Sequence, residues 1–165
     1  AWIFRCRNIL LITAGVLPVL LMCVFAYSWR SQPVLGTYAL EHSEQDGHFV
    51  WTAKTAYFQL CNPGNAFTVL EMRSGNPDIA DRPLNVRVVS SYGSSKKNTN
   101  HVLLADNAWR RIAVAYPAGS EKNGRARVRI EVPRLWKPGA GVVHGDQRWL
   151  GVMVKRPADI CGEHD

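Results

Sequence analysis

The chain reads RARVRIEV from Arg125 to Val132, and this stretch alternates apolar and charged side chains more clearly than any other. Successive side chains of a β-strand point to opposite faces, so the apolar residues of this stretch share one face and the charged residues share the other. One face is then buried and the other is solvated, as in an antiparallel sheet. We expect Arg125, Arg127 and Arg129 to point outward.

Shorter alternating segments, separated by turn residues, lie on both sides of this stretch. The loop at residues 92–100 is rich in Ser, Lys and Asn and is expected to be mobile. About eight short strands with no helical stretch among them predict an all-β fold, an antiparallel, jelly-roll-like β-sandwich of two stacked sheets. We expect the strands at residues 49–52, 55–61, 66–73, 84–91, 101–105, 109–116, 125–132 and 148–155.

A different pattern precedes these strands. Residues 9–29 read ILLITAGVLPVLLMCVFAYSW and contain no charged side chain. A helix of this length measures about 31 Å, close to the thickness of the hydrocarbon core of a bilayer. Arginines at both ends, with Trp2, Tyr27 and Trp29 near the interfaces, are typical of a transmembrane helix. A cleavable signal peptide is an alternative, since Ala26–Ser28 forms a small-x-small triplet.

The positive-inside rule sets the expected orientation of this span. Arg5 and Arg7 precede it without any acidic residue, although Arg30 weakens the asymmetry. We therefore expect a bacterial inner-membrane protein with its N-terminus inside and its domain in the periplasm. The expected organisation is a cytoplasmic stub (1–8), a transmembrane helix (9–29), a connector (30–48), a periplasmic β-sandwich (49–156) and a C-terminal tail (157–165).

Within the predicted span, Thr13, Ala14 and Gly15 form a patch of small residues, and Pro18 loosens the helix. Small residues let transmembrane helices approach one another closely, so this patch is a candidate contact with other subunits of a membrane complex. The alternative is that small residues and proline are simply frequent in membrane spans.

The formal net charge of the chain is +7. A mildly basic surface favours membrane lipid with anionic headgroups, or an acidic partner. The sequence contains no familiar nucleic-acid-binding motif, and we expect no nucleic acid among the partners.

The segments RVRIEVPRLWKPG and GDQRWLGVMV resemble the late strands of jelly-roll domains of the carbohydrate-binding-module style that are attached to bacterial membrane proteins. The resemblance covers Phe49 to Lys155 and implies a β-sandwich with a binding or structural role. A single-pass anchor that carries such a sandwich is also similar to accessory subunits of bacterial photosynthetic reaction centre and antenna complexes. This second likeness rests on architecture, without a defining motif.

Cys61 and Cys161 both follow the predicted span, and would lie in an oxidising compartment. In a jelly roll an early strand and the segment after the last strand often lie side by side. A disulfide between these two cysteines is therefore expected, with two unpaired thiols as the alternative.

Residues with catalytic or metal-binding chemistry are scattered along the sequence. The histidines stand singly, and the pair His144 and Asp146 is more typical of a solvated loop than of a metal site. No nucleophile elbow, zinc-protease motif or phosphate-binding glycine loop is present. We expect no enzymatic activity, no metal and no cofactor, although the helix could contact pigment or lipid.

Candidate interface residues are the arginines at positions 125, 127 and 129, together with Tyr38 and Trp136. Outward arginines also keep a sheet face soluble, which is the plainer interpretation. Trp136 lies between two prolines and is expected to be exposed or interfacial, whereas Trp109 and Trp149 are expected in the core.

Two functions fit these patterns. The first is a non-catalytic structural subunit whose helix packs on a larger membrane complex and whose sandwich braces the periplasmic face. The second is a membrane-tethered carbohydrate-binding module, which would bind glycan on an exposed aromatic side chain.

Overall fold

The computed structural model describes residues 18, 19, 22, 34–61, 66–92, 96–116, 125–139, 146–157, 160 and 161. The chain divides into two compact units, Ala1–Gln32 and Pro33–Asp165. In the first unit Pro18, Val19 and Met22 have helical backbone, and the rest of the predicted span, including Thr13, Ala14 and Gly15, lies outside the described residues. No helix within the described part of the chain is long and apolar enough to cross a membrane.

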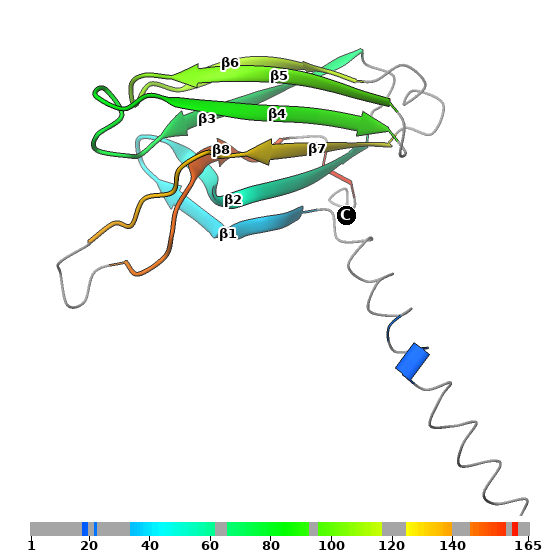
Figure 1. Ribbon diagram of the computed structural model, residues 1–165, viewed down its shortest axis with the longest axis horizontal. Coiled ribbons are helices and arrows are strands. Elements are labelled where there is room, and N and C mark those ends of the chain that lie inside the picture. Colours follow the sequence, from blue (N-terminus) through cyan, green and yellow to red (C-terminus); the bar gives the residue numbers. More distant parts are fainter. Residues whose placement is uncertain are drawn as a thin grey trace, which may run out of the picture. The chain divides into compact units, whose positions relative to one another are not determined.

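The second unit is an all-β domain whose described strands all pair in antiparallel fashion. Its eight strands form one sheet in the order β5-β4-β7-β2-β8-β3-β6, with β1 on the other edge of β2 (Figure 1). The strands are β1 (Val34–Ser43), β2 (Gly47–Cys61), β3 (Phe67–Ser74), β4 (Leu84–Tyr92), β5 (Lys96–Leu104), β6 (Arg110–Ala115), β7 (Arg125–Glu131) and β8 (Val152–Lys155).

Strand β2 joins the two layers of the domain. Residues Thr55–Cys61 pair with β7, while Phe49–Trp51 pair with β8. The sheet therefore continues through β2 from one layer into the other. Its two ends, β5 and β6, come into contact, and Ser90 Oγ on β4 donates a 2.6 Å hydrogen bond to the carbonyl of Ala115 on β6. The predicted all-β antiparallel fold is confirmed, but a nearly closed, barrel-like sheet replaces the two separate sheets.

The core lies between the two layers. In β7 the side chains of Ala126, Val128 and Ile130 are buried, while Arg125 and Arg127 are exposed and Arg129 is half-buried. The predicted faces of this strand are therefore confirmed. The largest fully buried side chains of the domain are Phe58, Leu60, Leu70, Met72, Leu84, Leu104, Ile130, Leu150 and Ile160.

Strand β1 lies where a polar connector was expected. It forms a hairpin with β2 in which Ser43 pairs with Gly47, and its register shifts once on each side of Thr37. The polar and glycine residues of this segment gave no strand pattern in the sequence. The strand is held in place by its backbone hydrogen bonds to β2, and none of its side chains is fully buried. Only residues 30–33 separate the predicted span from this strand.

Strand β5 corrects a second expectation. Lys96–Asn100 belong to this strand, although residues 92–100 were expected to form a mobile loop. They pair with Val88–Tyr92 on β4, so backbone pairing overrides a composition typical of loops. Strand β8 is also shorter than expected. Before it, Leu150 forms a bridge with Trp136, and the amide of Gly151 donates a 2.7 Å hydrogen bond to the carbonyl of Thr52.

The C-terminal segment returns to the edge of β2. Ile160 forms a bridge with Leu60, the amide of Cys161 donates a 2.9 Å hydrogen bond to the carbonyl of Gln59, and Cys61 and Cys161 form a disulfide. The predicted pairing of these two cysteines is confirmed. The disulfide closes the chain across a sequence separation of 100 residues.

Candidate functional site

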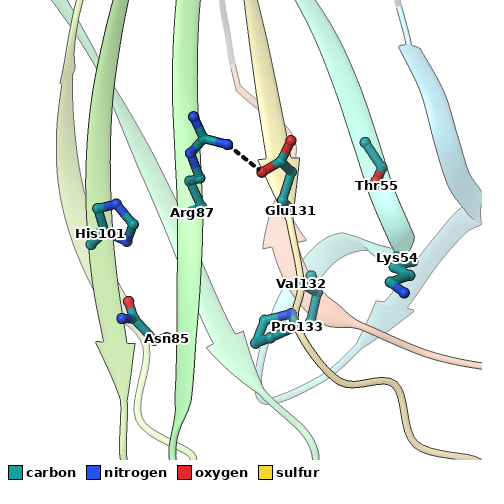
Figure 2. A pocket seen from close by; sticks show the side chains of 8 residues that line it. All are labelled: Lys54, Thr55, Asn85, Arg87, His101, Glu131, Val132 and Pro133. Atoms are coloured by element: carbon teal, nitrogen blue, oxygen red, sulfur yellow. Dashed lines mark hydrogen bonds and ion pairs between the residues drawn. The ribbon is translucent and has the colours of Figure 1, made fainter.

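A shallow groove of about 410 Å³ opens on the outer face of β4, β5 and β7 (Figure 2). The strand register places His101, Arg87 and Glu131 side by side in one row across it. Arg87 Nη1 lies 3.0 Å from Glu131 Oε2, so the carboxylate neutralises one of the cations. The groove is lined by Lys54, Thr55, Asn85, Arg87, His101, Glu131, Val132 and Pro133.

The same face carries the predicted arginine row. Arg129 lies beside Val89 of β4, and Arg127 lies beside Ser91, which in turn faces Lys97 of β5. Arg129 Nη2 contacts Glu131 Oε1 at 2.9 Å, so Glu131 bridges two cations. We call the outer face of β5, β4, β7 and residues 55–61 of β2 the basic face. In its described part Glu131 is the only carboxylate, whereas its cations are Arg87, Lys97, Arg125, Arg127 and Arg129.

The outer face of the other layer is covered at one end by a second apolar cluster. Its buried members are Phe49, Trp51, Leu150 and Met153, and the half-buried Tyr38, Trp109 and Trp136 pack against them. Phe49 to Thr52 are buried on both sides of β2. The uninterrupted run FVWT was the sequence signal for this burial, because a strand covered on both faces loses its alternation.

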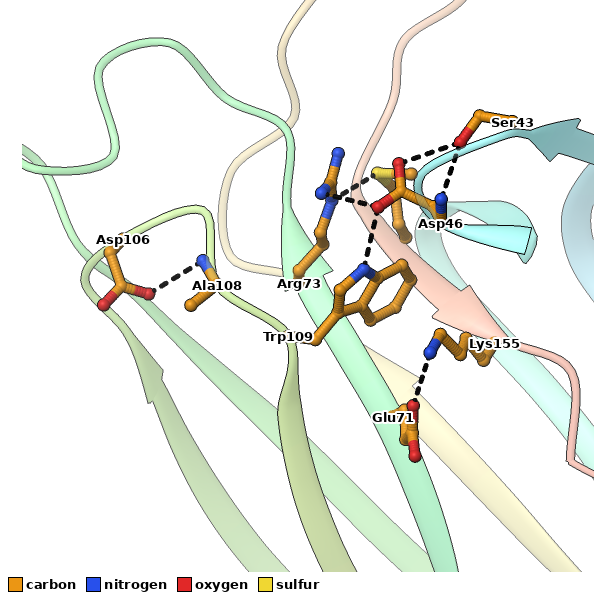
Figure 3. Close-up of polar contacts among 9 residues, drawn as sticks. Ser43, Asp46, Glu71, Arg73, Asp106, Ala108, Trp109 and Lys155 are labelled. Carbon is orange, nitrogen blue, oxygen red and sulfur yellow. Dashed lines mark hydrogen bonds and ion pairs between the residues drawn. The ribbon is translucent and has the colours of Figure 1, made fainter. Parts of the chain in front are cut away.

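A half-buried carboxylate joins the β1–β2 turn to this cluster (Figure 3). Asp46 accepts hydrogen bonds from the indole Nε1 of Trp109 at 2.9 Å and from Arg73 Nη1 at 2.8 Å, and Ser43 also donates to it. Its side chain is only 9 % exposed. The indole hydrogen bond, followed by those of Ser43 and the charge of Arg73, holds the pKa of Asp46 below its usual range despite its desolvation.

Trp109 lies between two cations. Arg73 and Lys155 approach its ring at 5.4 and 4.9 Å from the centroid, and Lys155 also forms a 2.8 Å ion pair with Glu71. The hydrogen bond from Lys155 lowers the pKa of Glu71. All these groups satisfy one another, which is typical of a structural network and leaves no free acid or base for catalysis among them.

A third polar cluster surrounds Arg148. This guanidinium contacts Glu41 and Asp146, each at 2.6 Å, and lies 5.2 Å from the ring centroid of Tyr38. Its hydrogen bonds lower the pKa of Asp146 and raise its own pKa. The Tyr38 hydroxyl donates a 2.9 Å hydrogen bond to the backbone carbonyl of Trp149. Tyr38, a predicted interface residue, thus holds β1 against the segment before β8.

The tryptophans occupy places different from those expected. Trp149 is 57 % exposed, so its predicted core position was wrong. Trp136 is half-buried in the second cluster, 5.9 Å from the ring of Trp51, and its indole Nε1 is buried without a hydrogen bond. Trp109 is half-buried at the edge of the same cluster. Local sequence did not show which of these tryptophans would pack against the second cluster.

An apolar strip lies on the outer face of β3 and β6, in the same layer as the second cluster. Phe67 is 53 % exposed and Val69 is also exposed. Their partners across the strand pair are Ala115 and Ala113, both exposed and both small. We call these four residues the apolar strip. The alternation of β3 in the sequence predicts which of its residues point outward. Their pairing with alanines on β6 depends on the strand register, which only the structure shows.

The described residues contain no cluster of three or more His, Cys, Asp or Glu side chains that could hold a metal ion. His42 and His48 face each other across the β1–β2 hairpin, with ring centroids 4.5 Å apart. His144 and His164 lie outside the described residues. Comparison of the chain with known protein families, characterised proteins and solved structures found no match.

Proposed function

We propose that this chain is a non-catalytic accessory subunit of a larger bacterial membrane complex. Residues 9–29 anchor it as a single-pass helix that contacts other subunits through Thr13, Ala14, Gly15 and Pro18, and the β domain braces the complex on its periplasmic side. Photosynthetic reaction centre and antenna complexes are one class of host that this architecture suits. The disulfide supports a location outside the cytoplasm, because such bonds persist in oxidising compartments.

The apolar strip carries this proposal. Exposed apolar surface that is contiguous across two strands is typical of a protein contact, whereas single exposed apolar residues are ordinary. The large side chains of Phe67 and Val69 lie beside the small Ala115 and Ala113. The strip therefore has both protruding side chains and space between them for the side chains of a partner. Removal of this surface from water by a partner subunit would be favourable.

The test is extraction of the full chain from its own membrane in mild detergent, followed by size analysis. The wild type should migrate with a larger assembly of constant composition, and Phe67→Asp should shift it to the size of the free chain, because a charge in the contact would have to be desolvated. Leu103→Asp is the matched control, since Leu103 is 64 % exposed on β5, outside the strip. A wild-type chain that migrates only as a monomer would refute the proposal.

A carbohydrate-binding module is the second candidate, and the exposure of Trp149 favours it. Jelly-roll modules, which residues 49–155 resemble, stack sugar rings on exposed aromatic side chains. Trp149 is exposed and follows Arg148 in the chain, and Arg148 with its partners Asp146 and Glu41 offers groups that hydrogen-bond hydroxyls. Glycan-array binding that is lost in Trp149→Ala, while the Phe67→Asp variant binds normally, would support this function. Absence of binding to any glycan would exclude it.

A further inference from the structure

Arginine and lysine side chains line the basic face. Three successive rows across its strands carry Arg87, then Arg129, then Lys97 and Arg127. Arg125, at the start of β7, extends the surface by one more residue. The groove lined by Lys54, Arg87 and His101 opens at the other end of this face.

The opposite layer shows a different arrangement of charge. There the acidic and basic side chains pair with each other, as in Glu71 with Lys155 and Arg111, and Asp46 with Arg73. Arg148 is likewise matched by two carboxylates. Basic side chains therefore outnumber acidic ones on the described part of the basic face, where Glu131 pairs with Arg87 and Arg129.

We propose that the basic face lies on the anionic phospholipid headgroups of the membrane that anchors the chain. This inference rests on the anchor in the proposed function. Residues 30–33 alone link the predicted span to β1, and four residues reach at most about 14 Å when fully extended. The first residue of β1 is then held within that distance of the end of the anchor, which keeps the domain within reach of the headgroups.

Charge complementarity selects the basic face for this contact. Long cationic side chains are attracted to an anionic membrane surface within about a Debye length. The apolar strip belongs to the other layer, so the domain can contact lipid with one layer and a partner subunit with the other. The positive charge thereby orients the domain rather than recruiting it, because the anchor already holds it at the membrane.

The experiment uses the full chain in nanodiscs of phosphatidylcholine alone or of an equal mixture of phosphatidylcholine and phosphatidylglycerol. Lysines are labelled with an amine-specific reagent and quantified by mass spectrometry. Labelling of Lys97 and Lys54 should fall about threefold or more in the anionic discs, and high salt should restore it, since surface charges are screened within a few ångströms at molar salt. Lys155, in the opposite layer, should label equally in both discs.

Charge variants show whether Lys97 is protected by electrostatic attraction to the lipid or only by its closeness to the disc. The double substitution Arg125→Glu and Arg127→Glu should restore labelling of Lys97 in anionic discs, whereas Arg111→Glu on β6 should leave it low. Glu131→Gln should lower the labelling of Lys97 in anionic discs further, because the substitution removes a negative charge from the basic face. Circular dichroism of each variant confirms that the sheet is intact.

Several outcomes would overturn the inference. Equal labelling in both discs would show that anionic lipid is not recognised, and protection that requires an added acidic protein would assign the face to that protein. Failure of the anchor gives a separate signal, because the chain would then not float with phosphatidylcholine vesicles at all.

Discussion

At the scale of single residues, Gly36 and Gly47 are required for different reasons, one for lack of space around it and both for their backbone conformation. Both have φ of 70°, in the left-handed region that favours glycine. A Cβ on Gly36 would lie 2.0 Å from the carbonyl oxygen of Thr55, whereas a Cβ on Gly47 would meet nothing within 4 Å. Gly36 therefore allows β1 to pass close to β2, while Gly47 only shapes the hairpin turn.

This contrast predicts two unequal losses of stability. Gly47→Ala should lower the free energy of unfolding by about 1 kcal/mol, the cost of a left-handed alanine. Gly36→Ala should lower it by about 3 kcal/mol or more, since the strand must also shift away from backbone atoms. Urea unfolding of both variants measures the difference. Equal losses of stability in the two variants would show that β1 does not pass close to β2 at Gly36.

Asp46 predicts a pH dependence of stability. Its pKa in the folded domain is lowered, so the unfolded chain binds more protons between the folded pKa and the ordinary value of 3.8. Its contribution is therefore complete above pH 3.8 and is lost as pH falls through the folded pKa. Asp46→Asn should cost about 2 kcal/mol at neutral pH, since it weakens charge-assisted hydrogen bonds.

The measurement is urea unfolding from neutral pH to acid, with wild type and Asp46→Asn compared at each pH. The gap between the two proteins should narrow as the carboxylate becomes protonated. Asp106→Asn is a suitable control, because Asp106 lies in an exposed turn before β6. A gap that stays constant to the lowest pH would contradict the role of the Asp46 charge.

At the scale of elements, the Cys61–Cys161 disulfide fastens the C-terminal segment to the end of β2. The other links described there are one bridge to Leu60 and one backbone hydrogen bond to Gln59. A crosslink that closes a long loop stabilises mainly by limiting the unfolded chain. In the described residues, the segment after β8 is therefore held by the disulfide, by these two backbone links and by the burial of Ile160 in the core.

Replacement of both cysteines by serine should lower the free energy of unfolding by about 2 to 4 kcal/mol. The sheet should keep its circular dichroism spectrum, because the disulfide lies at its edge. Urea unfolding of the oxidised wild type and of the double variant gives the comparison. A double variant as stable as the oxidised protein would show that the bond contributes nothing beyond local contacts.

At the scale of the whole molecule, Pro33–Asp165 forms a compact unit with its own core. We predict that this fragment, made in an oxidising compartment, is folded, with a β-type circular dichroism spectrum and a single cooperative unfolding transition. Phe67→Asp in the fragment should leave the transition nearly unchanged, because Phe67 is exposed. A fragment without a cooperative transition would show that the domain depends on residues before Pro33.

The sequence by itself determined which side chains of most strands face inward, because alternation is a local property of an extended chain. It predicted the burial of Val128 and Ile130 and the outward direction of the arginines beside them. It also predicted the cysteine pair. These features depend on a period of two residues and on the presence of only two cysteines after residue 29.

Only the tertiary structure decided the rest. Strand β1 is held by pairing with β2, and the sheet continues from one layer into the other through β2. Trp136 and Leu150 pack against Trp51, while Trp149 remains exposed. The basic face likewise exists because the register aligns Lys97, Arg87 and Arg127 from three separate strands. Pairing and coverage of this kind join residues far apart in the chain, and a local pattern contains no information on such distant neighbours.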